Sequence, residues 1–360
     1  MAEIITTLAQ ATPEWLTTVL PYGQVVAVHQ RVNAAFNSSV AHLELSYASG
    51  FPAQASSKFL LKLNQEEWGE NEVALYKLAA NQNPAMVFCH AAEYDPTTGN
   101  SYLLLEDISA THHAPLTREQ VLRGEGVPSD YQLEQIIITM ARFQAYFWQH
   151  PQLGQPPNLT QVRWYRDKTF FLQHLQRRRD EFAIFTEKAA QEVPSELLGL
   201  YSDTLAKLPG LWERYFAPRV STLKNMTISQ GDCYFTQFLC PKDPTNDHST
   251  YLVDFQDSGA NFPAFDLVYL LATFWTPEQR HYQNREEKLL RLYLSVLERS
   301  GVSGYSWDDL LTDYKLMLII VMLVPVWDQS YGASKSYWWP EMKCLTDNFQ
   351  DLNCAALFDF

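Results

Sequence analysis

The spacing of apolar residues changes in character near residue 107 of the 360-residue chain. Before that point, short runs show the alternating or continuous apolar pattern of β-strands, and one helical pattern at 67–80 interrupts them. After it, apolar residues recur at the three- and four-residue spacing of helices. The expected strands are 24–28, 40–48, 58–63 and 101–106, and the clearest later helices are 132–150, 286–298 and 307–324.

The helical part contains one β-like interruption. Two short apolar pieces, 235–239 and 251–255, flank a turn-rich stretch, and this pattern predicts a β-hairpin with a long loop. We therefore expect an α+β protein of two unequal lobes. A small β-rich lobe would span 1–107, and a larger, mainly helical lobe that carries the hairpin would span 108–360.

Charge and cysteine content exclude several classes of protein. The chain has 27 Lys and Arg against 41 Asp and Glu, a net charge of −14, which disfavours nucleic-acid binding and a polybasic membrane anchor. Its five cysteines form no zinc-spaced pair and are typical of a reducing compartment. The first residues lack a signal-peptide pattern, and the longest apolar run, 316–327, is shorter than the roughly 20 residues of a membrane span. We expect a cytoplasmic globular protein with that run as a buried helix.

Two aspartates lie at the end of the predicted hairpin that is opposite its loop. Asp232 precedes its first strand, Asp254 ends its second strand, and Gln237 lies between them in the chain. Phosphoryl transfer uses a carboxylate that orients the attacking hydroxyl, and oxygen ligands for Mg²⁺ on the nucleotide phosphates. The order is that of the kinase Asp-x-x-x-x-Asn loop and its metal-binding Asp, with Gln in place of Asn. We expect Asp232 to be catalytic, and Asp254 with Gln237 to hold Mg²⁺.

Two neighbouring residues are expected to support that loop. Asp266 begins an apolar helix, where its carboxylate would be an N-cap, and its predicted role is to hold the catalytic loop rather than to touch substrate. Gln230 lies just before Asp232, and its amide would fix the loop by hydrogen bonds.

The stretch 228–272 resembles the aminoglycoside phosphotransferase and choline kinase group, in which a His-Gly-Asp-x-x-x-x-Asn loop precedes an Asp-Phe/Trp-Glu/Gln strand and an Asp-Leu helix. The Asp-Phe-Gln at 254–256, with the EEKLLRLY segment at 286–293, is most similar to the ecdysteroid-kinase-like branch. The resemblance implies a protein-kinase-like bilobal fold. It also implies an ATP-dependent enzyme that uses Mg²⁺ and phosphorylates a hydroxyl of a small molecule.

Such a fold needs a strand lysine for the nucleotide phosphates and a glutamate partner from the next helix. Lys62 and Glu72 fit, because a lysine in an apolar strand is costly without a partner. Lys58, at the start of the strand, is the rival, and Lys62 could instead snorkel from an edge strand.

The first loop would present backbone amides to phosphate although it lacks glycine, and the hinge would contact adenine through its backbone. The residues are Asn37, Ser38 and Ser39 in the loop and Glu106 and Ile108 in the hinge.

The acceptor pocket is expected between the helical lobe and the catalytic loop. Four aromatic residues could line it, although core packing fits each of them equally well. They are Tyr234, Phe235, Trp275 and Trp338. The sequence does not identify the acceptor, does not distinguish ATP from GTP as the phosphoryl donor, and does not indicate the oligomeric state.

Three departures from the family pattern keep a second interpretation open, and the first is the loop without glycine at 33–39. Gln230 stands where the family has His, and Gln237 stands where it has the metal-binding Asn. A catalytically impaired protein that binds a nucleotide or metabolite is therefore the alternative, although the other key residues are retained. A protein kinase is disfavoured, because no Ala-Pro-Glu segment follows Asp254.

Overall fold

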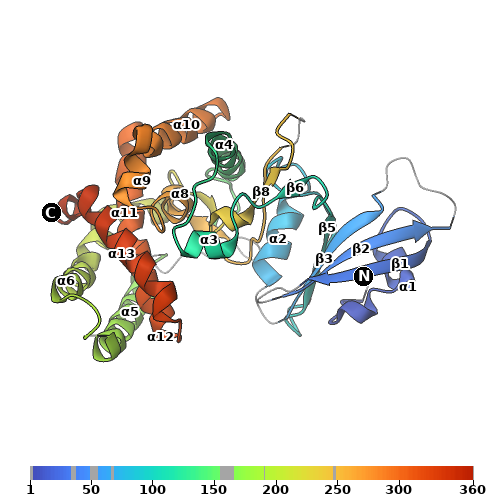
Figure 1. The fold of residues 1–360 in the computed structure, drawn as a ribbon, viewed down its shortest axis with the longest axis horizontal. Helices are drawn as coiled ribbons and strands as arrows, with labels where there is room; N and C mark the ends of the chain where they lie inside the picture. The colour runs from blue at the N-terminus through green and yellow to red at the C-terminus, as the bar shows by residue number, and fades with distance from the viewer. Residues whose placement is uncertain are drawn as a thin grey trace.

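The computed structural model shows a β-rich part joined to a larger helical part (Figure 1). The N-terminus lies on the β-rich part and the C-terminus at the far end of the helical part. The described residues are 3–33, 38–48, 56–65, 69–154, 166–189, 191–245 and 249–359.

An antiparallel five-stranded sheet forms the β-rich part, in the order β1-β2-β3-β5-β4. A 3-10 turn at Leu8–Gln10 and helix α1 precede it, and helix α2 follows β3. The predicted strands are present, with the first one longer than expected. The strands are β1 (Val25–Asn33), β2 (Ser39–Tyr47), β3 (Lys58–Asn64), β4 (Cys89–Tyr94) and β5 (Ser101–Glu106), and the helices are α1 (Pro13–Val19) and α2 (Glu70–Ala79).

Alternation along β3 decides which side chains reach which core. Phe59, Leu61 and Leu63 are buried in a small core with α1. Because successive side chains of a strand point to opposite faces, Lys62 is directed to the other face, on which α2 lies. The pattern of the strand thus places a charged amine on the side of the sheet that faces the rest of the molecule.

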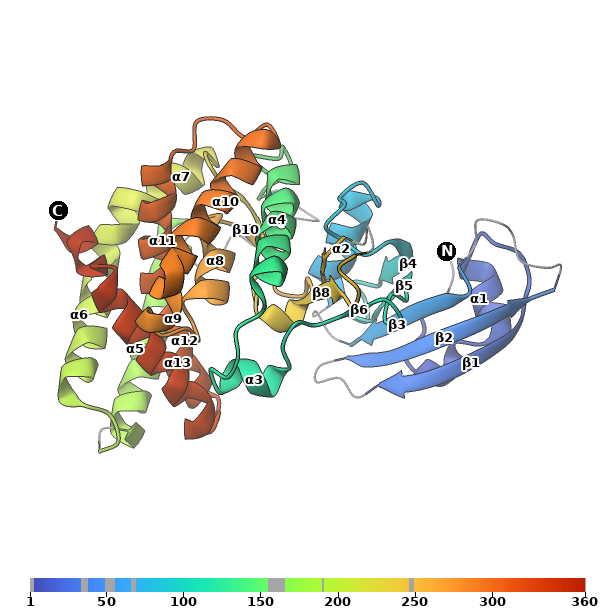
Figure 2. The same ribbon diagram turned by 45° about the horizontal axis from the view of Figure 1, so that its top comes forward.

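The helical part surrounds a large core that also includes the inner face of α2 (Figure 2). Phe255 connects the two parts, because its ring contacts Tyr76 of α2 and stacks on Phe143 of α4. The helices are α3 (Arg118–Leu122), α4 (Asp130–Tyr146), α5 (Lys168–Ala189), α6 (Ser195–Leu211), α7 (Ala217–Thr222), α8 (Ala264–Leu271), α9 (Pro277–His281), α10 (Arg285–Arg299), α11 (Trp307–Val321), α12 (Val324–Ser330) and α13 (Lys335–Asp351), with short turns at Trp212–Phe216, Tyr282–Asn284 and Cys354–Phe358.

Two small sheets lie within the helical part, and one of them contains the predicted hairpin. Strands β8 and β9 pair antiparallel, as expected, but the first residues of the predicted strand form a 3-10 turn, η4 (Phe235–Gln237). Strand β6 pairs with β8, and β7 pairs with β10. The strands are β6 (His112–His113), β7 (Thr227–Ser229), β8 (Phe238–Pro241), β9 (Tyr251–Leu252) and β10 (Gly259–Asn261).

The most apolar helix is interrupted by a proline. By length and composition Trp307–Ser330 could cross a membrane, but 72% of its apolar window is buried inside the fold, as in the core helix of a soluble protein. The predicted single helix at 307–324 ends early, at Val321. Pro325 lacks an N–H, and its ring would clash with the carbonyl of Val321 in a continuous helix, so α12 begins anew with the proline in its first turn.

Candidate active site

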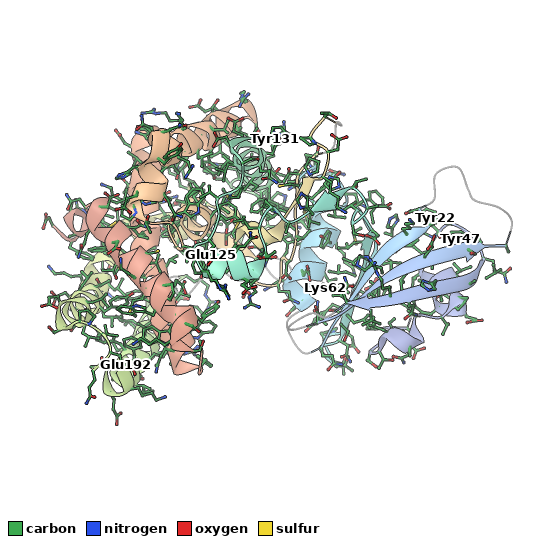
Figure 3. The ribbon with its side chains drawn as sticks, in the orientation of Figure 1. Tyr22, Tyr47, Lys62, Glu125, Tyr131 and Glu192 are labelled. Atoms are coloured by element: carbon green, nitrogen blue, oxygen red, sulfur yellow. The ribbon has the colours of Figure 1, made fainter. Side chains whose placement is uncertain are left out.

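Lys62 is paired with two carboxylates from distant parts of the chain. Its Nζ lies 2.8 Å from Glu72 Oε2 and 2.6 Å from Asp254 Oδ1. The residue is 9% exposed and lies on a central strand between β2 and β5, which excludes snorkelling from an edge (Figure 3). Burial alone lowers the pKa of Lys62, but the two carboxylates raise it above its usual value, so the amine stays charged. Lys58, the rival, is exposed.

Glu72 fixes both the lysine and the chain that follows Asp254. One of its oxygens faces Lys62, and the other accepts the N–H of Phe255 at 3.2 Å. Gln256 donates to Asn64 Oδ1 at 2.7 Å, which ties the same segment to the end of β3. Asp254 itself has φ 64°, a left-handed conformation that Asp tolerates better than most residues. The segment therefore has one defined position relative to α2 and the sheet.

Asp266 holds the loop that precedes Asp232. Its Oδ2 accepts the N–H of Gln230 at 2.9 Å and its Oδ1 accepts the N–H of Gly231 at 3.1 Å. Gln144 of α4 also donates to Oδ2, at 2.9 Å. The predicted N-cap role is wrong, because Pro263 is the N-cap and Asp266 lies in the first turn of α8 with its carboxylate directed to the loop.

Gln230 links the loop to the segment after β9 that contains Asp254. Its Oε1 accepts the N–H of Asp232 at 2.9 Å, and its Nε2 donates to the Asp254 carbonyl at 2.5 Å and the Val253 carbonyl at 3.3 Å. The side chain is fully buried. One amide thus sets the distance between the backbones of the two predicted functional aspartates, as the sequence-based interpretation of Gln230 expects.

Gln237 lies beside Asp254 at the mouth of the β8–β9 pair. Its carbonyl accepts the N–H of Val253 at 3.0 Å. The side chain of Asp254 is 41% exposed, and Gln237 is half-buried, so both can reach a ligand. No group of three or more His, Cys, Asp or Glu within the described ranges could hold a metal ion by itself. A carboxylate with an amide oxygen nevertheless suits Mg²⁺ that takes its other ligands from nucleotide phosphates and water.

The predicted nucleotide contacts lie in two places, at the start of β2 and at the end of β5. Asn37 falls outside the described residues, whereas Ser39 begins β2 opposite Leu63, next to Lys62. At the hinge, the N–H of Glu106 donates to the Phe88 carbonyl, and the Ile108 carbonyl accepts two amides. A contact with adenine would therefore use the carbonyl of Glu106 and the N–H of Ile108.

Three of the four predicted acceptor residues line one pocket. Tyr234, Phe235 and Trp275 border a narrow pocket between α3, η4 and α8. Trp338 does not line this pocket. It is 3% exposed and packs edge-to-face on Phe185, with ring centroids 5.3 Å apart, inside the core between α5 and α13.

Sequence reasoning missed two supporting amides. Gln144 lies on the apolar face of α4 and is fully buried, and Asn64 ends β3 at 2% exposure. A polar residue on an otherwise apolar helix face is the signal that could have identified Gln144, because a buried amide needs partners. Its partners, Asp266 and the Tyr293 hydroxyl, come from elements far away in the sequence.

Comparisons with known proteins agree with this fold. The sequence model of the ecdysteroid kinase-like family matches residues 71–301. The ethanolamine kinase Pv091845 of Plasmodium vivax is 12% identical, with 90% of this chain and 84% of that chain covered and a TM-score of 0.50. A search of curated proteins finds no match.

Two further solved structures have a similar fold. Amicoumacin kinase hAmiN, in complex with AMP-PNP, Ca²⁺ and Ami, is 12% identical, with 93% of this chain and 91% of that chain covered and a TM-score of 0.51. A thermostable mutant of aminoglycoside phosphotransferase APH(4)-Ia, in ternary complex with ADP and hygromycin B, is 10% identical, with 96% and 98% covered and a TM-score of 0.50. These likenesses establish a protein-kinase-like fold.

Proposed function

The chain belongs to the ecdysteroid kinase-like family, and on this premise we propose that it transfers the γ-phosphoryl group of ATP to a hydroxyl of a small molecule. The observation that carries the proposal is the buried amine of Lys62 held between Glu72 and Asp254. This pairing joins the sheet, α2 and the catalytic hairpin at one point, which is the arrangement that phosphoryl transfer from a nucleotide requires.

The β-rich lobe, 1–107, would bind the nucleotide. Lys62 would contact the phosphates, with the backbone amides of the β1–β2 loop beside it, and the hinge backbone would meet adenine. The kinase hAmiN binds AMP-PNP and the aminoglycoside phosphotransferase binds ADP, which supports ATP for this chain. Asp254 and Gln237 would hold Mg²⁺, which when bound neutralises charge on the phosphates.

The helical lobe, 108–360, would bind the acceptor. Asp232 would orient the acceptor hydroxyl and accept its proton as the phosphoryl group is transferred, with no covalent enzyme intermediate. Gln230 and Asp266 hold the backbone on which Asp232 stands, so they act as positioning residues. We place the enzyme in the cytoplasm, with a small-molecule acceptor and without nucleic-acid or membrane partners.

A second candidate, a nucleotide- or metabolite-binding protein without transfer activity, is favoured by one observation. Gln237 is one methylene longer than the family's asparagine, and Mg²⁺ demands a near-ideal octahedral geometry. In that case Mg-ATP would bind but no acceptor would be phosphorylated.

The test is Asp232→Asn. Mass spectrometry of a mixed hydroxyl library incubated with Mg-ATP identifies phosphorylated products, and thermal shift reports nucleotide binding. The variant should lose transfer while it still binds Mg-ATP, because Asp232 faces the acceptor rather than the phosphates. Wild-type turnover by the variant would contradict the assignment of Asp232, and Mg-ATP binding by the wild type without any product would favour the second candidate.

A further inference from the structure

The amide of Gln144 connects three helices through one buried polar group. Gln144 projects from α4 and is fully buried. Its Nε2 donates to Asp266 Oδ2 at 2.9 Å and to the Pro263 carbonyl at 3.2 Å, and its Oε1 accepts the hydroxyl of Tyr293. Asp266 lies in the first turn of α8, and Tyr293 lies on α10. A buried amide that has partners at both its NH₂ and its carbonyl end is held in one place.

The partners of Gln144 permit only one orientation of the amide. The Asp266 carboxylate and the Pro263 carbonyl accept hydrogen bonds, so they require the NH₂ end, and the Tyr293 hydroxyl is the donor at the other end. Burial raises the pKa of Tyr293 well above its usual value, and Asp266 and Asp313 raise it further, so the hydroxyl keeps the proton that it donates. Removal of this hydroxyl would leave the amide oxygen buried without the donor that holds it.

Asp266 transmits the position of Gln144 to the loop that precedes Asp232. The oxygen that accepts the Gln144 amide, Oδ2, also accepts the N–H of Gln230, and Oδ1 accepts the N–H of Gly231. Gly231 has φ 101°, a backbone conformation that residues with a side chain rarely adopt. The two hydrogen bonds therefore hold a specific loop geometry, and a displacement of the carboxylate would move the backbone next to Asp232.

Gln144 also holds the strand that leads into this loop. Its backbone carbonyl accepts the hydroxyl of Thr227 at 2.6 Å, and Thr227 begins β7, which ends directly before Gln230. Helices α4 and α10 lie side by side in Figure 2, so Tyr293 reaches the amide across a packed contact between the two helices. The backbone and the side chain of one residue thus hold both elements between which the loop lies.

We propose that Gln144 and Tyr293 are positioning residues for phosphoryl transfer. The Tyr293 hydroxyl holds the Gln144 amide, and the amide holds the Asp266 carboxylate. The carboxylate in turn holds the backbone next to Asp232. The inference rests on the proposed function, because it concerns the loop that carries the proposed catalytic aspartate. It extends the support of that loop from α8 through α4 to α10.

The first experiment replaces the amide by a carboxyl group of the same shape. In Gln144→Glu, a hydrogen bond to Asp266 forms only while the two carboxyl groups share a proton, because two carboxylates at this distance repel each other. The titratable groups in contact with this position are Asp266 and Tyr293, and Asp313 of α11 acts on Tyr293, which keeps its proton. Product formation from saturating Mg-ATP and the mixed hydroxyl library should therefore fall by about tenfold or more, relative to the wild type, as the pH rises from about 5 to about 8. Gln173→Glu adds the same charge at an exposed position of α5 and should follow the wild-type profile.

The second experiment asks whether Tyr293 acts through Gln144. Tyr293→Phe removes only the hydroxyl and should lower the rate at saturating Mg-ATP by about tenfold, with an unchanged KM for ATP. Gln144→Leu should lower the rate at least as much, and Tyr293→Phe should cause no further loss in that background, because the hydroxyl has then lost its acceptor. Tyr131→Phe, which removes the hydroxyl of an exposed tyrosine of α4 (Figure 3), is the control and should have the wild-type rate.

Hydrogen exchange tests the same connection without any acceptor. The amides of Gln230 and Gly231, which donate to Asp266, should exchange about tenfold faster in Tyr293→Phe and Gln144→Leu than in the wild type. The amides of β3 are the internal reference, because a general loss of stability would affect them as well. Mg-ATP binding, measured by thermal shift, should remain unchanged in both variants.

Three results would each overturn the inference and leave the proposed phosphotransferase. They are a wild-type pH profile in Gln144→Glu, additive losses in the double variant, and unchanged exchange of the loop amides. A purely structural role predicts these results together with lower melting temperatures. If the wild type forms no product, the proposed function is wrong, and the exchange measurement alone decides whether the connection exists. If Gln144→Leu does not fold, Gln144→Glu and Tyr293→Phe, which keep the shape of the side chains, provide the test.

Discussion

Two regions of the molecule treat buried charge in opposite ways: the proposed nucleotide side, and the contact between α12 and α13. On the nucleotide side, Lys62 lies between Glu72 and Asp254, and every one of these charges has a partner within 2.8 Å. Between α12 and α13, Glu341 is buried with no hydrogen-bond donor to its carboxylate among the described residues, and burial, Asp328 and Asp232 all raise its pKa. The first arrangement is complete before any ligand binds, whereas the second is satisfied only by a proton or a ligand. The comparison indicates that the Lys62 cluster contributes to stability and orientation, whereas the acidic pair costs stability when it is ionised.

The largest expected effect comes from removing the lysine that pairs with Glu72 and Asp254. Lys62→Met keeps the length of the side chain but leaves Glu72 buried without its partner. We expect the free energy of unfolding to fall by about 3–5 kcal/mol and phosphoryl transfer to fall by about a hundredfold or more. Urea denaturation and a product assay measure the two effects.

Lys58→Met is the matched control, because this exposed lysine begins the same strand. It should change the free energy of unfolding by less than about 0.5 kcal/mol. An equal loss of stability in both variants would show that the buried pairing is not what sets Lys62 apart.

A second prediction concerns the support beneath Asp232. In the wild type, the carboxylate of Asp266 accepts the backbone N–H groups of Gln230 and Gly231. Asp266→Asn replaces one carboxylate oxygen by an NH₂ group, which cannot accept either of these hydrogen bonds. We expect a loss of about 2–3 kcal/mol in unfolding free energy, with a lower kcat and an unchanged KM for ATP. Asp308→Asn, an exposed first-turn aspartate of α11, should leave both unchanged. A raised KM for ATP in Asp266→Asn would instead connect this residue to the nucleotide side.

Much of the paired side could be predicted from sequence, because its residues stand in short motifs. Lys62 is recognisable by what a charged residue costs in an apolar strand, Glu72 by its position in the next helix, and Asp254 by its order and spacing after Asp232 and Gln237. The N-cap prediction for Asp266 failed because α8 begins three residues earlier than expected, with Pro263 as its N-cap.

The unpaired side could not be predicted in the same way. Asp328 and Glu341 are single acids in helices that show no motif, and only the packing of α12 against α13 brings them together. Strand β4 was missed for a related reason, because all of its residues are half-buried and it lacks apolar alternation. Trp338 could not be assigned to core or pocket from its sequence neighbours, since that depends on the rotation of α13.

A third prediction concerns Asp328, whose titration should make the free energy of unfolding depend on pH. Burial raises the pKa of Asp328 to about 6 in the folded state, against about 3.9 in an unfolded chain. The folded state therefore binds more protons, and its stability falls as pH rises from about 4 to 6. Asp328→Asn removes this penalty, so the variant should match the wild type near pH 4 and exceed it by about 1–2 kcal/mol at pH 7.

The groups that interact with Asp328 are Glu341 and Tyr337; Asp232 acts on both of these, and Arg118 of α3 acts on Tyr337. Urea denaturation at the two pH values measures the difference, with Asp347→Asn, whose carboxylate is paired with Lys343 on α13, as a control that should show no such pH dependence. A gain that is the same at both pH values would mean that Asp328 does not titrate in this range.

The smallest expected effect comes from changing the proposed metal ligand Gln237. Gln237→Asn shortens the side chain by one methylene and restores the family's amide at this position. If Gln237 reaches Mg²⁺ with imperfect geometry, the variant should need a few-fold less Mg²⁺ for half-maximal transfer, a change of about 1 kcal/mol. Gln283→Asn, an exposed residue in a left-handed turn that Asn tolerates, is the control and should leave the Mg²⁺ requirement unchanged. A higher requirement in Gln237→Asn would show that the longer amide fits the surrounding backbone, so that the departure from the family pattern is an adjustment of the site rather than its decay.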